Sequence, residues 1–230
     1  MPPFLLQKAA ASMPILRKIS VILFLFIAFL APLVWFPGLS DFSNLPQRIF
    51  LETLGILLCF SWLTTQATDN GLPFHRFPFF TWPLLGFLGW AMFTGIYALN
   101  PYEAWEIGRQ WLVALLFFLL ASQLMISSAR RRQVLIALFT AAFLVAMLGI
   151  SQHLFGLSWI PQLAPPAANF ANKNMAVHFI VLLFPVGTFL FLTAKKDTTA
   201  WATSLMLSQI VVYLMSPVNL SKAGFTARKR

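Results

Sequence analysis

The chain has 230 residues, of which 59% are apolar and only 10% are charged, with 25 phenylalanines and a formal net charge of +10. This composition excludes an ordinary soluble domain and indicates an integral membrane protein. Its apolar runs are about 16 to 21 residues long and do not alternate as barrel strands do. They predict an all-α fold, a polytopic bundle of membrane helices, because backbone polar groups in lipid must be paired.

We expect seven membrane spans. In chain order they cover residues 19–36, 45–65, 79–99, 105–126, 134–154, 175–192 and 201–215. Arg17 and Lys18 precede the first span, which has no small-residue cleavage site and is therefore expected to be an uncleaved anchor. The connections are short, so residues 1–230 are predicted to form a single transmembrane domain, with residues 1–18 as a cytoplasmic tail.

The basic residues predict the orientation of the chain. Those on one side are Lys8, Arg17, Lys18, Arg76, Arg130, Arg131, Arg132, Lys195 and Lys196. The charged residues expected on the other side, through the sixth span, are Asp41, Arg48, Glu103, Glu106, Arg109 and Lys173. The positive-inside rule then places the N-terminus in the cytoplasm. The basic loops are interpreted as topology signals that touch anionic membrane lipids, and no nucleic-acid partner is predicted.

Motifs of soluble-enzyme chemistry are missing from the sequence. Cys59 is the only cysteine, and the three histidines lack the spacing of metal ligands. No HExxH, phosphate-binding glycine loop or GxSxG is present. No metal site is predicted.

The stretch "NPYEAWEIGRQW" opens the fourth span. Asn100 is a suitable N-cap, Pro101 suits the first helical position, and Glu103 lies where a capping-box acid would. Glu106 and Arg109 continue at three-residue spacing, which allows ion pairing. The alternatives are a capped, salt-bridged helix start and a part in substrate binding by Glu103 and Arg109.

A second polar stretch, "NFANKNMAVHFIVLLFP", opens the sixth span. It places four polar residues at the expected membrane boundary, namely Asn172, Lys173, Asn174 and His178. Asn174 and His178 are four residues apart and share one helix face. Polar side chains at this depth usually face the bundle interior or a wet cavity. Two readings stay open, namely capping with interhelical hydrogen bonds and binding of a polar ligand.

This second stretch resembles the motif of the O-antigen ligase, O-antigen polymerase and bacterial O-oligosaccharyltransferase superfamily. The residues that match the family motif are Phe170, Asn172, Asn174, Ala176 and Pro185. The stretch "NPYEAWEIGRQWLVALLFFLLAS" is similar to the segment that the family carries two spans earlier.

The tail after the seventh span, "LSKAGF", is similar to the family's Ser-Arg-Gly/Ala-aromatic motif. Ser221 matches the serine, and Lys222 stands in for an arginine thought to engage the donor's diphosphate. A lysine keeps the charge but lacks the bidentate fork of arginine. The alternative is that Lys222 belongs to an interfacial basic tail.

The resemblance implies transfer of a glycan from an undecaprenyl-diphosphate carrier at the outer face of the bacterial inner membrane. The acceptor would be lipid A-core, a growing glycan or a protein hydroxyl. Such chemistry needs cations that hold the diphosphate and a base for the acceptor, and no nucleotide or redox cofactor.

Family members are about twice as long, and their catalytic histidine lies in a large outward loop that follows these spans. The resemblance therefore covers nearly all of this chain but only the N-terminal half of a family member. We expect a fragment or split protein that does not catalyse transfer alone and whose partner is a second polypeptide supplying the rest. A non-catalytic membrane partner and a small-solute transporter remain alternatives, although the inverted repeats typical of transporters are missing.

Overall fold

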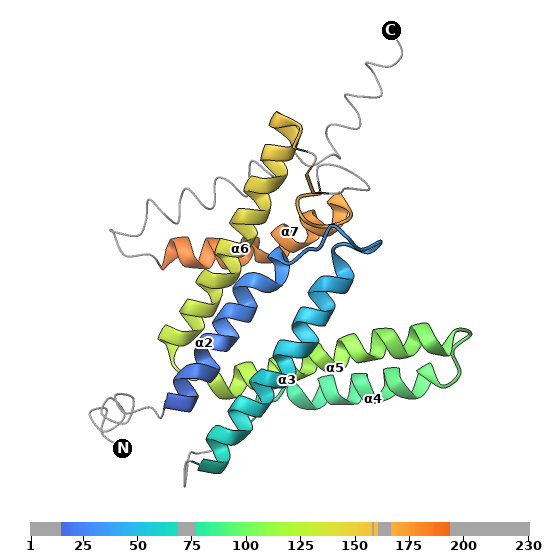
Figure 1. Ribbon diagram of the computed structural model, residues 1–230. Helices are drawn as coiled ribbons and strands as arrows, with labels where there is room; N and C mark the ends of the chain where they lie inside the picture. Colours follow the sequence, from blue (N-terminus) through green and yellow to red (C-terminus); the bar gives the residue numbers. More distant parts are fainter. Residues whose placement is uncertain (1–14, 69–76, 158, 161–166, 194–230) are drawn as a thin grey trace. The chain divides into compact units, whose positions relative to one another are not determined.

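The computed structural model describes residues 15–68, 77–157, 159–160 and 167–193, and within these residues it contains helices and no strands. The elements, shown in Figure 1, are α2 Ile15–Leu30, the 3-10 helix η1 Ala31–Leu33, α3 Asn44–Thr68, α4 Thr81–Gly95, α5 Pro101–Leu124, α6 Ser128–Phe155 and α7 Lys173–Leu192. The all-helical prediction is thus confirmed for the described residues.

Among the described residues, five helical segments are long and apolar enough to cross a membrane. They are Ile15–Leu33, Asn44–Ala67, Pro101–Leu124, Ser128–Phe155 and Lys173–Leu192. Several such segments in one chain make it a helical, multi-pass membrane protein. The expected span 201–215 lies outside the described residues.

The expected span 79–99 differs most from the structure. The helix there, α4, has 15 residues, which gives a length of about 22 Å against the ~30 Å of a hydrocarbon core. Residues 96–100 connect α4 to α5. Pro101 disfavours helical geometry at Asn100, which is extended, with φ −123° and ψ 90°. The chain needs these residues to reverse from α4 into α5.

Local sequence explains most helix ends. Asp41 accepts a hydrogen bond from the backbone N–H of Asn44 at 2.9 Å and so closes the start of α3. At the end of α2, Pro32 lies in the 3-10 turn η1, and the chain is extended from Val34. This is why the first helix stops before the expected residue 36.

The described chain divides into two compact units. The first comprises residues 15–25, 51–68 and 77–130. Within it, α4 and α5 form an antiparallel hairpin in which the ring of Phe87 lies edge-on to Trp111, with centroids 5.6 Å apart. The same unit joins α2 to α3 through a 2.8 Å hydrogen bond between the hydroxyls of Ser20 and Ser61.

The second unit comprises residues 26–50 and 131–193, without the undescribed positions. Its core is an antiparallel pair of helices, α6 and α7. Val145 and Ala146 of α6 pack with Ala176 and Ile180 of α7, nearer the loop that joins the helices. At the other end of the pair, Arg132 donates to the carbonyl oxygen and hydroxyl of Thr193, at 3.2 and 3.1 Å, and closes α7.

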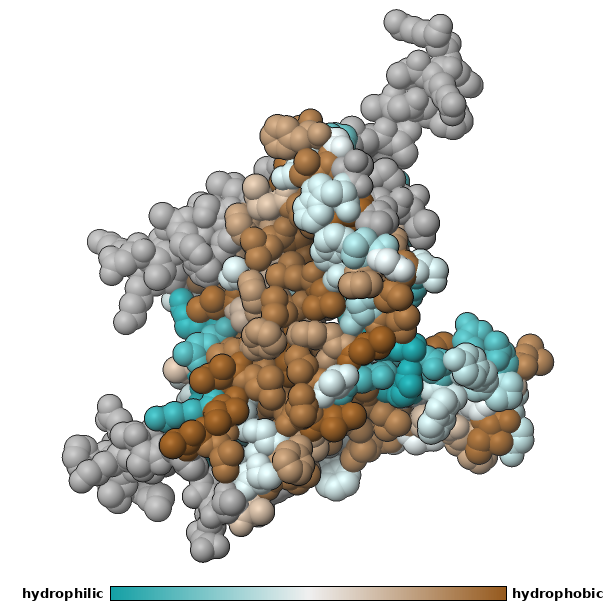
Figure 2. Space-filling view, viewed as in Figure 1, coloured by the Kyte–Doolittle hydropathy of each residue, from teal (hydrophilic) through white to brown (hydrophobic). Residues whose placement is uncertain are grey.

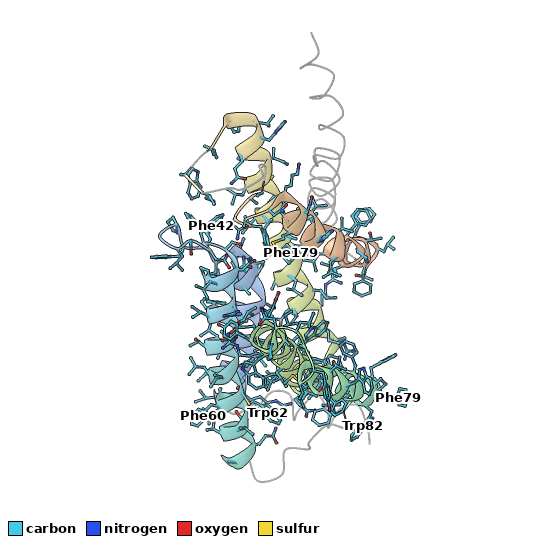
Figure 3. All side chains as sticks on the ribbon, turned by 90° about the vertical axis from the view of Figure 1, so that its right-hand side faces the viewer. Phe42, Phe60, Trp62, Phe79, Trp82 and Phe179 are labelled. Atoms are coloured by element: carbon cyan, nitrogen blue, oxygen red, sulfur yellow. The ribbon has the colours of Figure 1, made fainter. Side chains whose placement is uncertain are left out.

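Large apolar side chains cover the outside of the helices. Figure 2 shows apolar residues over most of the coloured surface, and Figure 3 labels Phe60 on α3, Phe79 just before α4 and Trp82 on α4. Their exposed fractions are 67%, 79% and 67%. So much exposed aromatic surface is suited to lipid rather than to water.

Candidate functional site

The candidate site lies at the start of α7, where Asn172 is the N-cap. Its backbone is extended, and its side-chain oxygen accepts a hydrogen bond from the N–H of Asn174 at 2.9 Å. This bond satisfies one of the backbone donors that every helix start leaves unpaired. Asn172 therefore has a structural task, which is one of the two readings that the sequence left open.

The loop before α7 is held by a glutamine that the sequence analysis did not single out. The side-chain nitrogen of Gln152, near the end of α6, donates to the carbonyl oxygen of Ala168 at 2.7 Å. The side-chain oxygen of Gln152 accepts from the N–H of Ala168 at 2.8 Å. Ala168 is in the left-handed region at φ +54°, a conformation that costs an alanine about 1 kcal/mol or more. The paired bonds stabilise this turn, and both residues are buried.

Two further hydrogen bonds fix the same loop. The side-chain nitrogen of Asn169 donates to the carbonyl oxygen of Pro32 at 2.6 Å. The N–H of Ala171 donates to the hydroxyl of Ser43 at 3.2 Å. Asn169 is 1% exposed and Ser43 is fully buried, so these bonds lie inside the second unit. Residues 167–170, which end the loop, are therefore part of the interior of the second unit.

The amide of Asn169 is only half satisfied. Its side-chain oxygen is buried and has no hydrogen-bond partner among the described residues. An unpaired buried acceptor costs about 1 to 3 kcal/mol. The donated bond to Pro32 fixes the orientation of the amide, since a flipped amide would turn its oxygen toward another oxygen.

The apolar residues of the motif are core residues. Phe170 is 8% exposed and Ala176 is 5% exposed, and both belong to the cluster with Ile180. The ring of Phe170 lies 5.8 Å from that of Phe179 between centroids. These residues pack the start of α7 against α6. Pro185 lies inside α7, where its ring removes one helical hydrogen bond.

The polar residues of the motif face outward. Asn174 and His178 are exposed and lie one helical turn apart on α7, whereas Lys173 at the first position is half-buried. Among the described residues no neighbouring helix covers Asn174 or His178, and their part in binding a polar ligand stays a prediction. In the described part of the chain, both side chains are accessible to a ligand or to water at the end of the helix.

Glu103 and Arg109 have structural partners. Asn100 caps α5, accepting from the N–H of Glu103 at 3.3 Å and donating to its carboxylate at 3.3 Å. Arg109 lies 3.4 Å from Glu106 on its own helix and 3.1 Å from Glu52 of α3. The contact with Glu52 is an ion pair without hydrogen-bond geometry. Arg109 is therefore flanked by two carboxylates and is poorly suited to bind a diphosphate as well.

The remaining predicted site residues, Ser221 and Lys222, lie outside the described residues. Among the residues that the structure does describe, no group of three or more His, Cys, Asp or Glu side chains could hold a metal ion.

Sequence reasoning missed Glu52, Gln152 and Asn169. Glu52 had a signal, because a carboxylate inside an expected span needs a partner or a polar surrounding. Gln152 and Asn169 gave a weaker signal, since each is an amide at a span boundary and its partner is a backbone group that sequence spacing does not reveal.

We find no protein-family model, curated protein or solved structure that matches the chain. The class of helical, multi-pass membrane proteins therefore rests on the sequence and on the helices themselves. The functional interpretation rests on the motif residues and on the geometry of the loop that carries them.

Proposed function

We propose that this chain forms the donor-binding membrane part of a glycan ligase or polymerase in the bacterial inner membrane. Its substrate would be a glycan carried on undecaprenyl diphosphate, and the acceptor would be lipid A-core, another glycan or a protein hydroxyl at the periplasmic face. The observation that carries the proposal is the pair of exposed side chains, Asn174 and His178, on the first turns of α7. They directly follow a loop fixed by internal hydrogen bonds and occupy the stretch that resembles the family motif.

The chemistry of these side chains suits the headgroup of such a donor. The amide of Asn174 both donates and accepts hydrogen bonds, as sugar hydroxyls do, and the imidazole of His178 also offers a donor and an acceptor. Lys173 adds a positive charge at a helix N-terminus, where backbone N–H groups and the helix dipole favour an anion such as a diphosphate.

The anchored loop would contribute preorganisation. Headgroup binding is weakened when the protein has to order a flexible segment first. The bonds made by Gln152, Asn169 and Ser43 fix residues 168–171 before any ligand binds. Lys222 and Ser221 stay in the proposal as further residues that contact the lipid-linked glycan donor. Glu103 and Arg109 are better explained as residues that stabilise α5.

A binding experiment tests the proposal. The full chain in lipid nanodiscs is titrated with a polyprenyl-diphosphate glycan. We expect Asn174→Ala and His178→Ala each to weaken binding about 5- to 10-fold, the size of one lost polar contact. Thr188→Ala, a polar truncation almost three turns beyond His178 along α7, is the matched control and should leave the affinity unchanged.

Two outcomes would contradict the proposal. One is that the unsubstituted chain does not bind the lipid-linked glycan, and the other is that both substitutions leave the affinity unchanged. Solute uptake into vesicles by a chain that fails to bind the glycan would favour a transporter.

A further inference from the structure

Two tryptophans of the second unit contact each other outside its helices. Trp35 follows the 3-10 helix η1, and Trp159 follows the end of α6. Their ring centroids are 5.5 Å apart, and the ring planes are inclined at 61°. These two residues, the tryptophan pair, thus come from two connecting segments that are far apart in the sequence.

Hydrogen bonding and packing place the tryptophan pair near the start of α7. The carbonyl oxygen of Pro32 accepts the hydrogen bond from Asn169, and Leu33 packs against the cluster that contains Phe170. Trp35 follows Pro32 by three residues, which span at most about 11 Å. The pair is therefore close to the loop that leads into α7.

Trp159 is held at the surface by its neighbours. The next residue, Ile160, is 1% exposed, whereas Trp159 itself is 58% exposed and Trp35 is half-buried. Because the two rings meet at an angle and do not stack, more than half of Trp159 stays accessible beside its contact with Trp35. The buried isoleucine and the contact with Trp35 position the ring of Trp159 before any ligand binds.

The backbone around the pair indicates a position at the membrane surface. Residues 34–43 form no helix, and the N–H of Phe36 closes this segment by donating to the carbonyl oxygen of Phe42 at 2.8 Å. After the end of α6, Gly156 is in the left-handed region at φ +62°. Irregular backbone that faces lipid does not occur in the hydrocarbon core. The exposed ring of Trp159 therefore lies at the depth of lipid headgroups, where the first sugars of a lipid-linked glycan would also lie.

A sugar ring matches the chemistry of these side chains. A pyranose presents C–H groups on its faces and hydroxyls around its rim. The face of an indole ring is electron-rich and attracts such C–H groups, and its Nε1–H can donate to a hydroxyl oxygen. An acyl chain needs only apolar surface, which the exposed rings of α4 offer as well.

We propose that Trp35 and Trp159 form a subsite for one sugar ring of the lipid-linked glycan, with the exposed ring of Trp159 against the sugar face. The inference rests on the proposed function and extends it, because the tryptophan pair would recognise the glycan itself. Lys173 and Asn174, at the start of α7, would contact the diphosphate and the adjoining sugar.

The test compares the binding of two lipids to the full chain in nanodiscs, a polyprenyl diphosphate that carries an oligosaccharide and the same polyprenyl diphosphate without it. Trp159→Ala is expected to weaken binding of the glycan-bearing lipid about 3- to 10-fold, the size of one lost ring contact, and to change binding of the bare lipid less than about twofold. Trp159→Phe keeps an aromatic face and should bind the glycan-bearing lipid more tightly than Trp159→Ala. Trp82→Ala removes a tryptophan of similar exposure from α4 and is the matched control, which should change neither affinity.

The outcomes separate the subsite from the proposed function. If the unsubstituted chain binds the glycan-bearing lipid and Trp159→Ala leaves that affinity unchanged, the subsite is wrong and the proposed function stands. Equal weakening for both lipids would also overturn the subsite, since Trp159 would then act on the lipid and not on the sugar. An unsubstituted chain that binds neither lipid would contradict the proposed function and the subsite together.

Discussion

At the scale of single residues, Gln152 has the largest local effect on the candidate site. Its carboxamide forms hydrogen bonds with both the N–H and the carbonyl of Ala168. Ala168 is in the left-handed region of a loop, so these two backbone groups have no partners in a helix or strand. After this turn, Asn169 forms a hydrogen bond with Pro32 and Ala171 forms one with Ser43. The exposed positions of Asn174 and His178 depend on this turn.

Gln152→Ala should therefore destabilise the protein. It leaves the N–H and the carbonyl of Ala168 buried without partners, which lowers the free energy of unfolding by about 1 to 3 kcal/mol. Gln133→Ala, the same change at an exposed position of α6, is the control and should stay within about 0.5 kcal/mol. Unfolding in mixed detergent micelles measures both free energies. Equal stabilities of the two variants would show that the paired hydrogen bonds contribute no net stability.

At the scale of elements, close packing of α6 on α7 depends on a glycine. A Cβ added at Gly187 would overlap the ring of Phe139, which is itself 1% exposed and cannot move aside. Membrane helices commonly approach each other at small residues, because lipid gives them no hydrophobic driving force and close contact must replace it. Gly86 and Gly89 of α4 differ, since a Cβ there would meet nothing within 4 Å.

The same substitution should then have opposite effects in the two helices. Gly187→Ala forces α7 away from Phe139 and is expected to lower the free energy of unfolding by about 1 to 3 kcal/mol. Gly89→Ala adds helix propensity without a clash and is expected to raise it by about 0.5 to 1 kcal/mol. Thermal unfolding in detergent tests the pair, and a stabilising Gly187→Ala would contradict the packing described for α6 and α7.

At the scale of the whole molecule, hydrogen bonds join residues that the sequence separates widely. Asn169 and Pro32 are 137 residues apart, and Arg132 and Thr193 are 61 apart. The polar groups involved are backbone carbonyls at helix ends, which need partners because lipid provides none. These bonds fasten the helix ends of the second unit to one another.

The orientation of the molecule in the membrane is testable with two serines. In a Cys59→Ala background, Ser40→Cys and Ser128→Cys place single thiols at exposed positions in the turns before α3 and at the start of α6. We expect a membrane-impermeant maleimide to label Ser40→Cys in intact cells and Ser128→Cys only after permeabilisation, as the positive-inside rule requires. The reverse labelling pattern would invert the predicted topology and would move the start of α7 to the cytoplasmic side.

The sequence by itself determined the class of the protein and the local starts of its helices. Long apolar runs must form helices in lipid, and an asparagine such as Asn100 or Asn172 caps a helix with its own neighbours, so both features follow from short-range chemistry. Tertiary structure alone decided the pairing of Arg109 with Glu52 and the partners of Gln152 and Asn169, because these partners come from other segments of the chain. It also decided that α4 is short and that Asn174 and His178 are exposed. Periodicity places side chains on a helix face, but only the packing of the neighbouring helices determines which face is covered.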